Sequence, residues 1–550
     1  MKKITFNFLF IFTLLFTTST VAQTRYLDPV FPSVDTTNNI VYGVNYTVMV
    51  PGYVLPTGAV IPGVGAIPSL NFQFFEPTGD TEPERPLILY LHTGTFAPII
   101  RNGNPTGSKD YDFATQVFCN QYAARGYAVA NLEYRLGWNP YLPTEPERAA
   151  SLMKAAYRGI QDVKSAIRFF RMSYENGNPY AIDTSRIIVC GQGTGGWIAT
   201  CLNSVDKLSE LQLPKFLDGN GIPLIDTAVL GDWDGFGGVD TLNIPNHPGY
   251  SSEHDMVLNM GGAIGDISWL EAGDKPIAAV HGNLDAIAVF SSGNLSVSGV
   301  NVVSAISGSH DVVKKANMLG NNSSIPNLYD PYTLAAKHAS AGLVGSMDFG
   351  GTTINETPDN LFPFNTGNPG EGAPWDYWDS ATVVYLATAQ GLPDSVGTQA
   401  HLSGLQTNPN MSLTKSYAYI DSTLNFFCPR IVNALMLPGN TVGITNNDKG
   451  LSVNVYPNPA SDFVSFNSST NINSISIPGF KSINSFILGV SQVVPKLTTV
   501  VTVSFPFSLS LCPLRLDSTS FNFEMISCAD LKRYSPFSVK TKPLACLSKS

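Results

Sequence analysis

The sequence predicts an α/β protein, with a mostly parallel central sheet covered by helices and a small β-sandwich-like module at the C-terminus. Three observations predict this fold class. Short apolar runs alternate with helical patterns between about residues 39 and 435, which is typical of a parallel sheet. A long amphipathic segment at 146–174 begins with a helix-capping signal. A β-branched run at 186–190 leads directly into the glycine-rich turn at 191–196.

Size and composition limit the classes of function. The chain has 550 residues, which exceeds one ordinary core and predicts a large domain with a smaller one. With 43% hydrophobic and 13% charged residues it is neither a disordered chain nor a coiled coil. The net charge of -10 excludes nucleic acid as a partner. The 7 cysteines have no disulfide or zinc-site spacing and no nucleotide-binding motif occurs, so we expect no metal and no cofactor.

The N-terminus has the pattern of an export signal. Lys2 and Lys3 precede an apolar run at 6–16, and small residues follow before Gln23. This run is shorter than the roughly 20 residues that a membrane-spanning helix needs. We therefore expect residues 1–22 to be a cleaved signal peptide. The mature protein is then secreted or held at the cell surface, without a stable membrane span.

Residues 23–436 are expected to form the large domain. In chain order, a strand at 87–92 follows Pro86, a helix occupies 113–124, and a strand at 128–134 follows a turn. Thr144 and Glu147 have capping-box spacing and begin the helix that extends to about residue 174. The remaining expected elements are strands at 186–190, 256–260, 277–281 and 302–306 and a closing helix at 417–435.

Four motifs in this domain lie where strands are expected to end. They are His92-Thr93-Gly94-Thr95-Phe96, Glu133-Tyr134-Arg135-Leu136-Gly137, Gly191-Gln192-Gly193-Thr194-Gly195-Gly196 and His281-Gly282-Asn283-Leu284-Asp285. Through them, residues 39–435 resemble α/β-hydrolases of the carboxylesterase and lipase kind. The resemblance implies an α/β-hydrolase fold and a carboxylic ester or acyl substrate. It also implies backbone N–H donors at Gly94, Thr95 and Thr194 for an oxyanion, and Asp285 as the acid of a catalytic triad.

The histidine of such a triad follows the acid in the chain, in a loop after the last core strand. His310 meets this expectation, because it follows the apolar run at 302–306 through Ser307-Gly308-Ser309. We therefore predict Asp285 and His310 as the acid and the base. The alternative is that His310 is a loop histidine without a catalytic role.

One position departs from the hydrolase pattern. The centre of the glycine-rich turn, where a serine nucleophile is expected, is Gly193. Glycine cannot attack a carbonyl, Thr194 is expected to point elsewhere, and Cys190 belongs to the strand. Loss of the nucleophile costs about a million-fold in turnover, which puts catalytic competence in doubt. Three interpretations stay open: a hydrolase that activates water, a non-catalytic protein that binds an acyl or glycan ligand, and a structural surface component.

An aromatic cluster gives a further candidate for binding. Phe362-Pro363-Phe364 and Pro374-Trp375-Asp376-Tyr377-Trp378 lie between turn-forming residues. Trp375 could belong to a cap or a stacking platform for an acyl chain or a sugar. The alternative is a small buried core of a long insertion.

The C-terminal part begins after a linker at 437–450. In residues 451–550, a short strand ends in Tyr456-Pro457-Asn458-Pro459-Ala460, and a second strand is expected at 463–466. This motif resembles the C-terminal sorting domain of type IX secretion substrates, which implies the secretion machinery as a partner. An ordinary β-sandwich appendage is the alternative. After about residue 467 the pattern fades, and a reading-frame shift in the source gene is our hypothesis for this change.

Overall fold

The computed structural model describes residues 23–47, 68–139, 142–297 and 300–438, together with five short strands farther along the chain. Its centre is an eight-stranded sheet in the order β1-β2-β4-β3-β5-β6-β8-β11. Strand β2 pairs antiparallel with both of its neighbours, β1 and β4, and every other pair of neighbouring strands in this sheet is parallel. This order and direction form an α/β-hydrolase fold, as the sequence predicts. The strands are β1 (Val34–Val44), β2 (Ser69–Pro77), β3 (Arg85–Leu91), β4 (Ala128–Leu132), β5 (Ile182–Gln192), β6 (Met256–Met260), β8 (Ile277–Gly282) and β11 (Leu361–Phe364).

Both faces of the sheet are buried, because its central strands are mostly apolar and every residue of β3, β4, β6 and β8 is buried. Side chains alternate between the two faces of a strand. In β3, Leu87, Leu89 and Leu91 pack into one core. Ile88 and Tyr90 of the same strand pack into the core on the opposite face. Continuous apolar runs therefore form the strands, and helices cover both sides.

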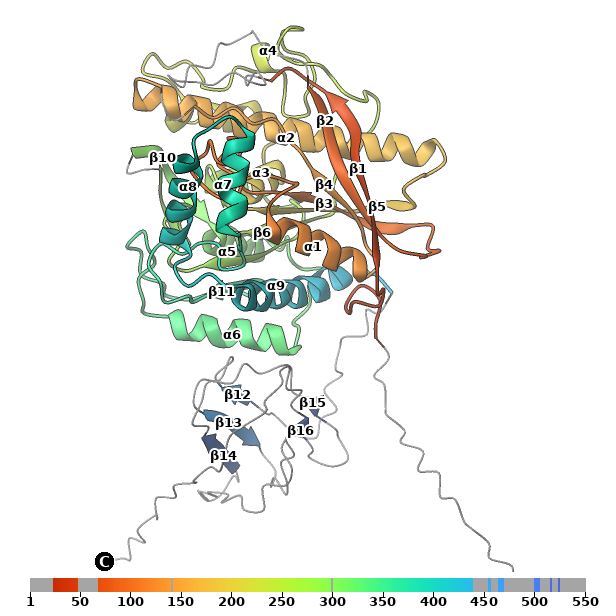
Figure 1. Cartoon of the computed structure of the whole chain (residues 1–550), viewed down its shortest axis with the longest axis vertical. Coiled ribbons are helices and arrows are strands. Elements are labelled where there is room, and N and C mark those ends of the chain that lie inside the picture. The colour runs from red at the N-terminus through yellow and green to blue at the C-terminus, as the bar shows by residue number, and fades with distance from the viewer. Residues whose placement is uncertain are drawn as a thin grey trace, which may run out of the picture.

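Helices lie on both sides of the sheet (Figure 1). One side carries α2 (Glu145–Glu175) and α3 (Thr194–Leu202), and the other carries α1 (Phe113–Ala124) and α9 (Leu413–Ala434). At the start of α2, Thr144 Oγ1 accepts the N–H of Glu147 at 3.4 Å, and Glu147 accepts the N–H of Thr144 at 3.0 Å. This confirms the predicted capping box.

The strand expected at 302–306 exists but does not belong to the central sheet. It is part of β10 (Val300–Gly308), which pairs with β9 (Ser292–Val297) and β7 (Ala263–Ile264) in a separate three-stranded sheet. The last strand of the central sheet is instead β11, which pairs parallel with β8. Pro363 within β11 hides it in the sequence, because proline is tolerated only in an edge strand such as this one.

The other helices are mostly insertions between the sheet strands. Two of them, α7 (Ser380–Ala389) and α8 (Asp394–Thr407), pack against each other and against Ile99 and Ile100 of the loop after β3. Trp378 anchors this contact, since its Nε1 donates to His401 Nδ1 at 3.0 Å. The remaining helices are α4 (Thr227–Leu230), α5 (Ser309–Leu319) and α6 (Pro331–Leu343), with short 3-10 turns at Leu208–Gln212, Pro214–Phe216 and Ile267–Trp269.

Five short strands are described in the C-terminal part. The first three, β12 (Asn454–Tyr456), β13 (Phe463–Ser468) and β14 (Thr499–Ser504), form an antiparallel sheet. The other two, β15 (Arg515–Leu516) and β16 (Phe523–Glu524), pair with each other. The strand expected at 463–466 coincides with β13, whereas residues 1–22 and 439–453 lie outside the described residues. The sorting assignment and the predicted domain boundaries stay predictions. None of the described helices has the length and hydropathy required to cross a membrane.

Candidate active site and apolar pocket

The predicted elbow between β5 and α3 is present. Gly193 joins the two elements with φ 54° and ψ -115°, a backbone conformation that glycine adopts far more readily than other residues. Its N–H donates to the carbonyl oxygen of Met260 at 2.8 Å. The strand therefore turns sharply into the helix, and Gly193 lies at the carboxyl end of the sheet, where a nucleophile elbow belongs.

Glycines beside the elbow allow α3 to lie close to the sheet. A Cβ atom at Gly191 would be 2.1 Å from the carbonyl oxygen of Gly195, and one at Gly195 would be 2.2 Å from that of Leu91. No side chain fits at these distances. The glycine-rich motif is thus explained by packing and needs no nucleotide ligand.

Thr93 occupies the space in which the nucleophile of a hydrolase would lie. A Cβ atom at Gly193 would be 2.2 Å from Thr93 Oγ1 and 3.1 Å from Thr93 Cβ. Rotation of the Thr93 side chain moves Oγ1 but not Cβ, so the second close contact persists. The elbow therefore carries no serine, and Thr93 occupies the space that a side chain at position 193 would need. In the sequence, the only signal is a threonine where the hydrolase motif His-Gly-Gly has its first glycine.

The loop after β3 has a strained backbone. Gly94 has φ 133°, and Thr95 and Phe96 both have φ 53°, which is uncommon for residues other than glycine. Such strain is found at functional sites. Thr95 Oγ1 donates to the Gly94 carbonyl oxygen at 2.7 Å. The structure thus places Gly94 and Thr95 in an irregular loop next to the elbow residue, as expected, while their role as oxyanion donors stays a prediction.

Thr194 is the first residue of α3, where backbone N–H groups have no partner within the helix and the helix dipole favours negative charge. Its Oγ1 is 3.2 Å from Tyr134 Oη, which in turn donates to the His92 carbonyl oxygen at 2.7 Å. The Thr194 hydroxyl is held by this contact and not by a base. The expected use of its N–H as an oxyanion donor is consistent with this position and stays a prediction.

Asp285 lies just after β8, at the same edge of the sheet. Its Oδ1 accepts the N–H groups of Ile287 at 2.7 Å and Ala288 at 3.1 Å. Its Oδ2 is 3.6 Å from His281 Nε2, but that ring nitrogen is closer to the Ala288 carbonyl oxygen, at 2.8 Å. Backbone N–H groups thus fix the carboxylate of Asp285, and the loop after β11 covers it, since a Cβ at Gly372 would lie 2.2 Å from Oδ2.

His310 does not pair with Asp285, which corrects the expected acid and base pair. Its Nδ1 is 2.7 Å from Asp311 Oδ1 and its Nε2 is 2.6 Å from the Glu356 carbonyl oxygen. Burial disfavours the charged imidazole, but these two acceptors outweigh it and raise the pKa of His310. Because both ring nitrogens face these acceptors, neither is placed to take a proton from a nucleophile or a water. The physical reason for the error is that His310 follows β10, which lies outside the central sheet.

The loop after β11, residues 365–372, is the place where this fold holds its catalytic histidine, and it contains none. Its Glu371 is fully buried and forms an ion pair with Lys415 of α9. Asn368 Nδ2 donates to the same carboxylate at 2.7 Å. Of the three predicted triad positions, only that of the acid carries a side chain of the expected type, Asp285, and its catalytic role stays a prediction.

Trp375 is buried, with 1% of its surface exposed, and belongs to the core on the α9 side of the sheet. It packs against Phe364 of β11, with the ring centroids 6.2 Å apart. Its Nε1 has no hydrogen-bond partner among the described residues. This position favours the buried-core interpretation of the aromatic cluster over an open stacking platform.

Next to Trp375, a buried carboxyl group supports the elbow. Asp376 Oδ1 accepts a hydrogen bond from Gln192 Nε2 at 2.8 Å, and Gln192 Oε1 accepts one from Tyr90 Oη at 3.1 Å. Burial raises the pKa of Asp376 to about 7, although the Gln192 bond opposes this shift. The side chain before Gly193 is therefore fixed by a polar network that the sequence did not indicate.

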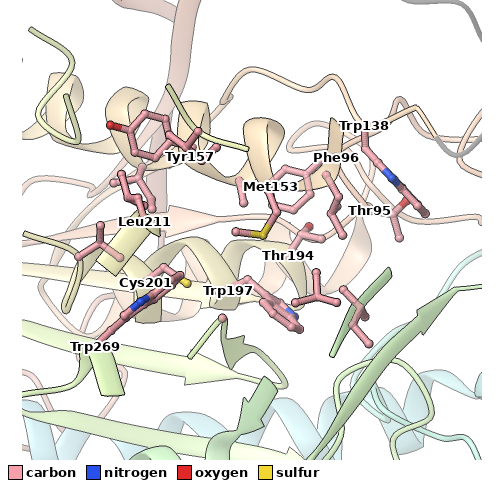
Figure 2. Close-up of a pocket in the computed structure, with 18 of the residues that line it drawn as sticks. Thr95, Phe96, Trp138, Met153, Tyr157, Thr194, Trp197, Cys201, Leu211 and Trp269 are labelled. Carbon is pink, nitrogen blue, oxygen red and sulfur yellow. The ribbon is translucent and has the colours of Figure 1, made fainter. Parts of the chain in front are cut away.

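An apolar pocket begins beside the elbow. It contains about 830 Å³ of space free of atoms, part of it open to solvent. Figure 2 shows Thr95 and Thr194 near one end and Cys201, Leu211 and Trp269 at the other. Nearly all of its wall is apolar, and it is formed by α2, α3, the strands β9 and β10, and loops beside them. The aromatic lining residues are Phe96, Trp138, Tyr157, Trp197 and Trp269.

Comparison with known proteins agrees with the fold. Residues 72–295, less than half of the chain, match the model of the BD-FAE family, an α/β-hydrolase-type esterase family. A search of curated proteins gave no match. The match and the topology together support an esterase-like α/β-hydrolase.

Three similar solved structures have low sequence identity to this chain. The bifunctional GH43-CE protein of Bacteroides eggerthii is 18% identical over 46% of this chain and 29% of its own, with a TM-score of 0.28. A truncated carbohydrate esterase from gut microbiota is 16% identical over 48% of this chain and 80% of its own, with a TM-score of 0.25. Native Est2, a thermophilic esterase of Thermogutta terrifontis, is 12% identical over 71% of this chain and 99% of its own, with a TM-score of 0.29.

Proposed function

We propose that this protein binds an apolar acyl ligand in the pocket beside the elbow and does not hydrolyse it through an acyl-enzyme. The observation that carries the proposal is the contrast between two neighbouring spaces. The pocket at Thr95 and Thr194 is open, whereas the nucleophile space at Gly193 is filled by Thr93. Hydrolysis by an activated water is disfavoured as well, because both ring nitrogens of His310 face other acceptors.

The lining favours an aliphatic chain or an aromatic body over a sugar. Five aromatic residues and several aliphatic ones form the wall, and the hydroxyl-bearing Thr95 and Thr194 lie near one end. At the other end, Tyr157 Oη and Trp269 Nε1 already donate to backbone carbonyl oxygens. A ligand with an apolar body and a carbonyl group fits this distribution, since the α3 N-terminus favours an oxygen with partial negative charge. Each buried CH₂ contributes about 0.8 kcal/mol, so affinity should rise about fourfold per methylene until the chain fills the pocket.

A titration with straight-chain methyl esters of increasing length tests this proposal. Calorimetry gives the affinity, and tryptophan fluorescence gives a second readout, because Trp138, Trp197 and Trp269 line the pocket. We expect saturable binding that tightens with chain length and no release of the acid. An affinity that does not depend on chain length would contradict the proposal.

Two matched variants on α2 locate the binding site. Ala156 lines the pocket, so Ala156→Trp should block it and lower the affinity at least tenfold. Tyr174 is on the same helix but is exposed and outside the pocket, so Tyr174→Trp should bind as the parent does. Met153→Lys is a milder second test, because it places a charge on the apolar wall. Equal affinity in all of these proteins would place the ligand elsewhere.

We further propose that the protein is exported and sorted to the cell surface or the medium. Support comes from the charged start and apolar run before Gln23 and from the Tyr456-Pro457-Asn458-Pro459-Ala460 motif. Sequencing of the N-terminus of the mature native protein should find Gln23 as its first residue, and an intact Met1 would contradict cleavage. Detection of the printed C-terminal peptide by mass spectrometry in native protein would refute the frame-shift hypothesis.

A further inference from the structure

A second groove lies at the amino edge of the sheet, opposite the elbow. Two adjoining hollows, with about 650 and 400 Å³ of free space, share five lining residues: Thr333, Lys337, Asp359, Asn360 and Arg430. Asn360 immediately precedes β11, and Asn322, another lining residue, accepts the N–H of Ile277 at the start of β8. The groove is thus separate from the apolar pocket, which begins at the carboxyl edge.

Arg430 forms part of the wall of this groove and carries an unpaired charge. Only 2% of the residue is exposed, and no carboxylate of the described residues lies within 4.0 Å of its guanidinium group. Nη1 donates to Thr333 Oγ1 at 3.0 Å and to the Phe426 carbonyl oxygen at 2.8 Å. Burial of a charged group without a counter-ion is costly, and burial lowers the pKa of Arg430 to about 9.

The contacts of Arg430 leave Nε and Nη2 without a hydrogen-bond partner among the described residues. The guanidinium group lies over the Phe426 ring, with Cζ 3.4 Å from the ring centroid. Of the two nitrogens, Nε is buried. Because Nη2 is not among the buried unpartnered atoms, this N–H group is the one that can donate a charge-assisted hydrogen bond to a carboxylate in the groove.

The other charges of the groove add a second cation. Lys337 is exposed at its rim, with Nζ 3.5 Å from Asp359 Oδ1. Asp330 and Asp359 act on Arg430 at longer range and partly offset its charge. With Arg430 and Lys337 against Asp359, the shared lining has one net positive charge. Amide and hydroxyl side chains surround it, and they suit a polar ligand and not an acyl chain.

We propose that this groove binds a small carboxylate, held by Nη2 of Arg430 and by Lys337. The ligand class follows from the unpaired guanidinium group, the positive lining and the polar wall. It is a different ligand from the apolar one of the proposed function, and neither proposal depends on the other.

Calorimetry on the full chain at constant ionic strength tests this proposal, with sodium acetate, sodium glucuronate and the neutral isostere acetamide as probes. We expect acetate or glucuronate to bind saturably and acetamide not to bind. Tighter binding of glucuronate would show that the carboxylate is carried on a hydroxyl-bearing body, and equal binding would show that a bare carboxylate suffices. No saturable binding of either carboxylate, or equal binding of acetamide, would overturn the proposal.

Variants connect the binding to the groove. Arg430→Gln should lower the affinity at least tenfold, as expected for a lost charge-assisted pair. Lys337→Gln keeps every buried contact and should lower the affinity severalfold, which keeps the test valid if Arg430→Gln does not fold. Lys314→Gln is the control, because Lys314 is an exposed lysine of α5 that pairs with Glu356 outside the groove. Unchanged affinity in Lys337→Gln and Arg430→Gln, or in Lys337→Gln alone if the other variant is unfolded, would refute the assignment.

Discussion

Restoring a serine to the elbow should be costly while Thr93 is present and much less costly without it. In the structure, a Cβ at Gly193 would lie 2.2 Å from Thr93 Oγ1 and 3.1 Å from Thr93 Cβ. Gly193→Ser therefore meets two penalties, the contact with Thr93 and the positive φ of 54°. Thr93→Gly removes the first penalty and leaves the second.

The two penalties can be estimated separately. A residue other than glycine in such a backbone region costs roughly 1–3 kcal/mol, and overpacking of a filled site costs typically about 1–3 kcal/mol. Gly193→Ser alone should thus lower the free energy of unfolding by roughly 2–6 kcal/mol. In the Thr93→Gly background, the same change should cost only the backbone share. The double-mutant cycle should give a coupling energy of about 1–3 kcal/mol, with the double variant more stable than the sum of the singles.

Urea unfolding of the four proteins measures this coupling. Thr93→Ser is the matched control, because it keeps both contacting atoms and should leave the cost of Gly193→Ser unchanged. If Gly193→Ser lowers the free energy of unfolding by the same amount in the wild-type background and in the Thr93→Gly background, Thr93 does not occupy the nucleophile space. The double variant should show no acyl-enzyme burst with an activated ester, because the loop at 365–372 supplies no histidine.

Three further predictions concern titration and buried charge. Burial raises the pKa of Asp376 to about 7, so the free energy of unfolding of the wild-type protein should fall as pH rises from about 4 to about 7. Asp376→Asn should remove this fall in urea unfolding at pH 5 and 8. An equal change in the free energy of unfolding between the two pH values in both proteins would contradict the prediction. The raised pKa of His310 contributes stability that is lost as pH rises through that pKa. His310→Asn should therefore flatten the plot of unfolding free energy against pH above about pH 6. A steeper plot in the variant would count against the contacts of His310 with Asp311 and the Glu356 carbonyl oxygen. Lys415→Ala leaves the Glu371 carboxylate buried and unpaired, so it should lower the free energy of unfolding by about 3–5 kcal/mol. If Lys415→Ala lowers the free energy of unfolding by less than Glu371→Gln does, the pair is not coupled.

Local patterns predicted much of the fold. The helix α1 and the strand β6 begin and end where the apolar spacing places them, because both are bounded by clear turn signals. The elbow at Gly193 was also predicted, since a β-branched run before a glycine-rich turn is a local signature. By contrast, β11 has four residues with a proline inside. Its identity as a strand depends on pairing with β8, which no local pattern shows.

The candidate site was harder to predict because its outcome depends on tertiary contacts. The sequence showed that Gly193 lacks a nucleophile, but the side chain that fills the space comes from Thr93, about a hundred positions earlier. His310 has the right order in the chain, yet it follows a strand of the smaller sheet and is held by Asp311 and the Glu356 carbonyl. Chain order alone did not distinguish these two sheets.

The most direct test of the central claim is stopped-flow mixing of the wild-type protein with p-nitrophenyl hexanoate, following tryptophan fluorescence and nitrophenolate release together. The fluorescence reports occupation of the pocket lined by Trp138, Trp197 and Trp269, and the nitrophenolate reports attack on the ester. We predict a saturable change in fluorescence with no burst of nitrophenolate. A burst equal to the protein concentration would show that the protein forms an acyl-enzyme and would contradict the claim that Gly193 and Thr93 leave the elbow without a nucleophile.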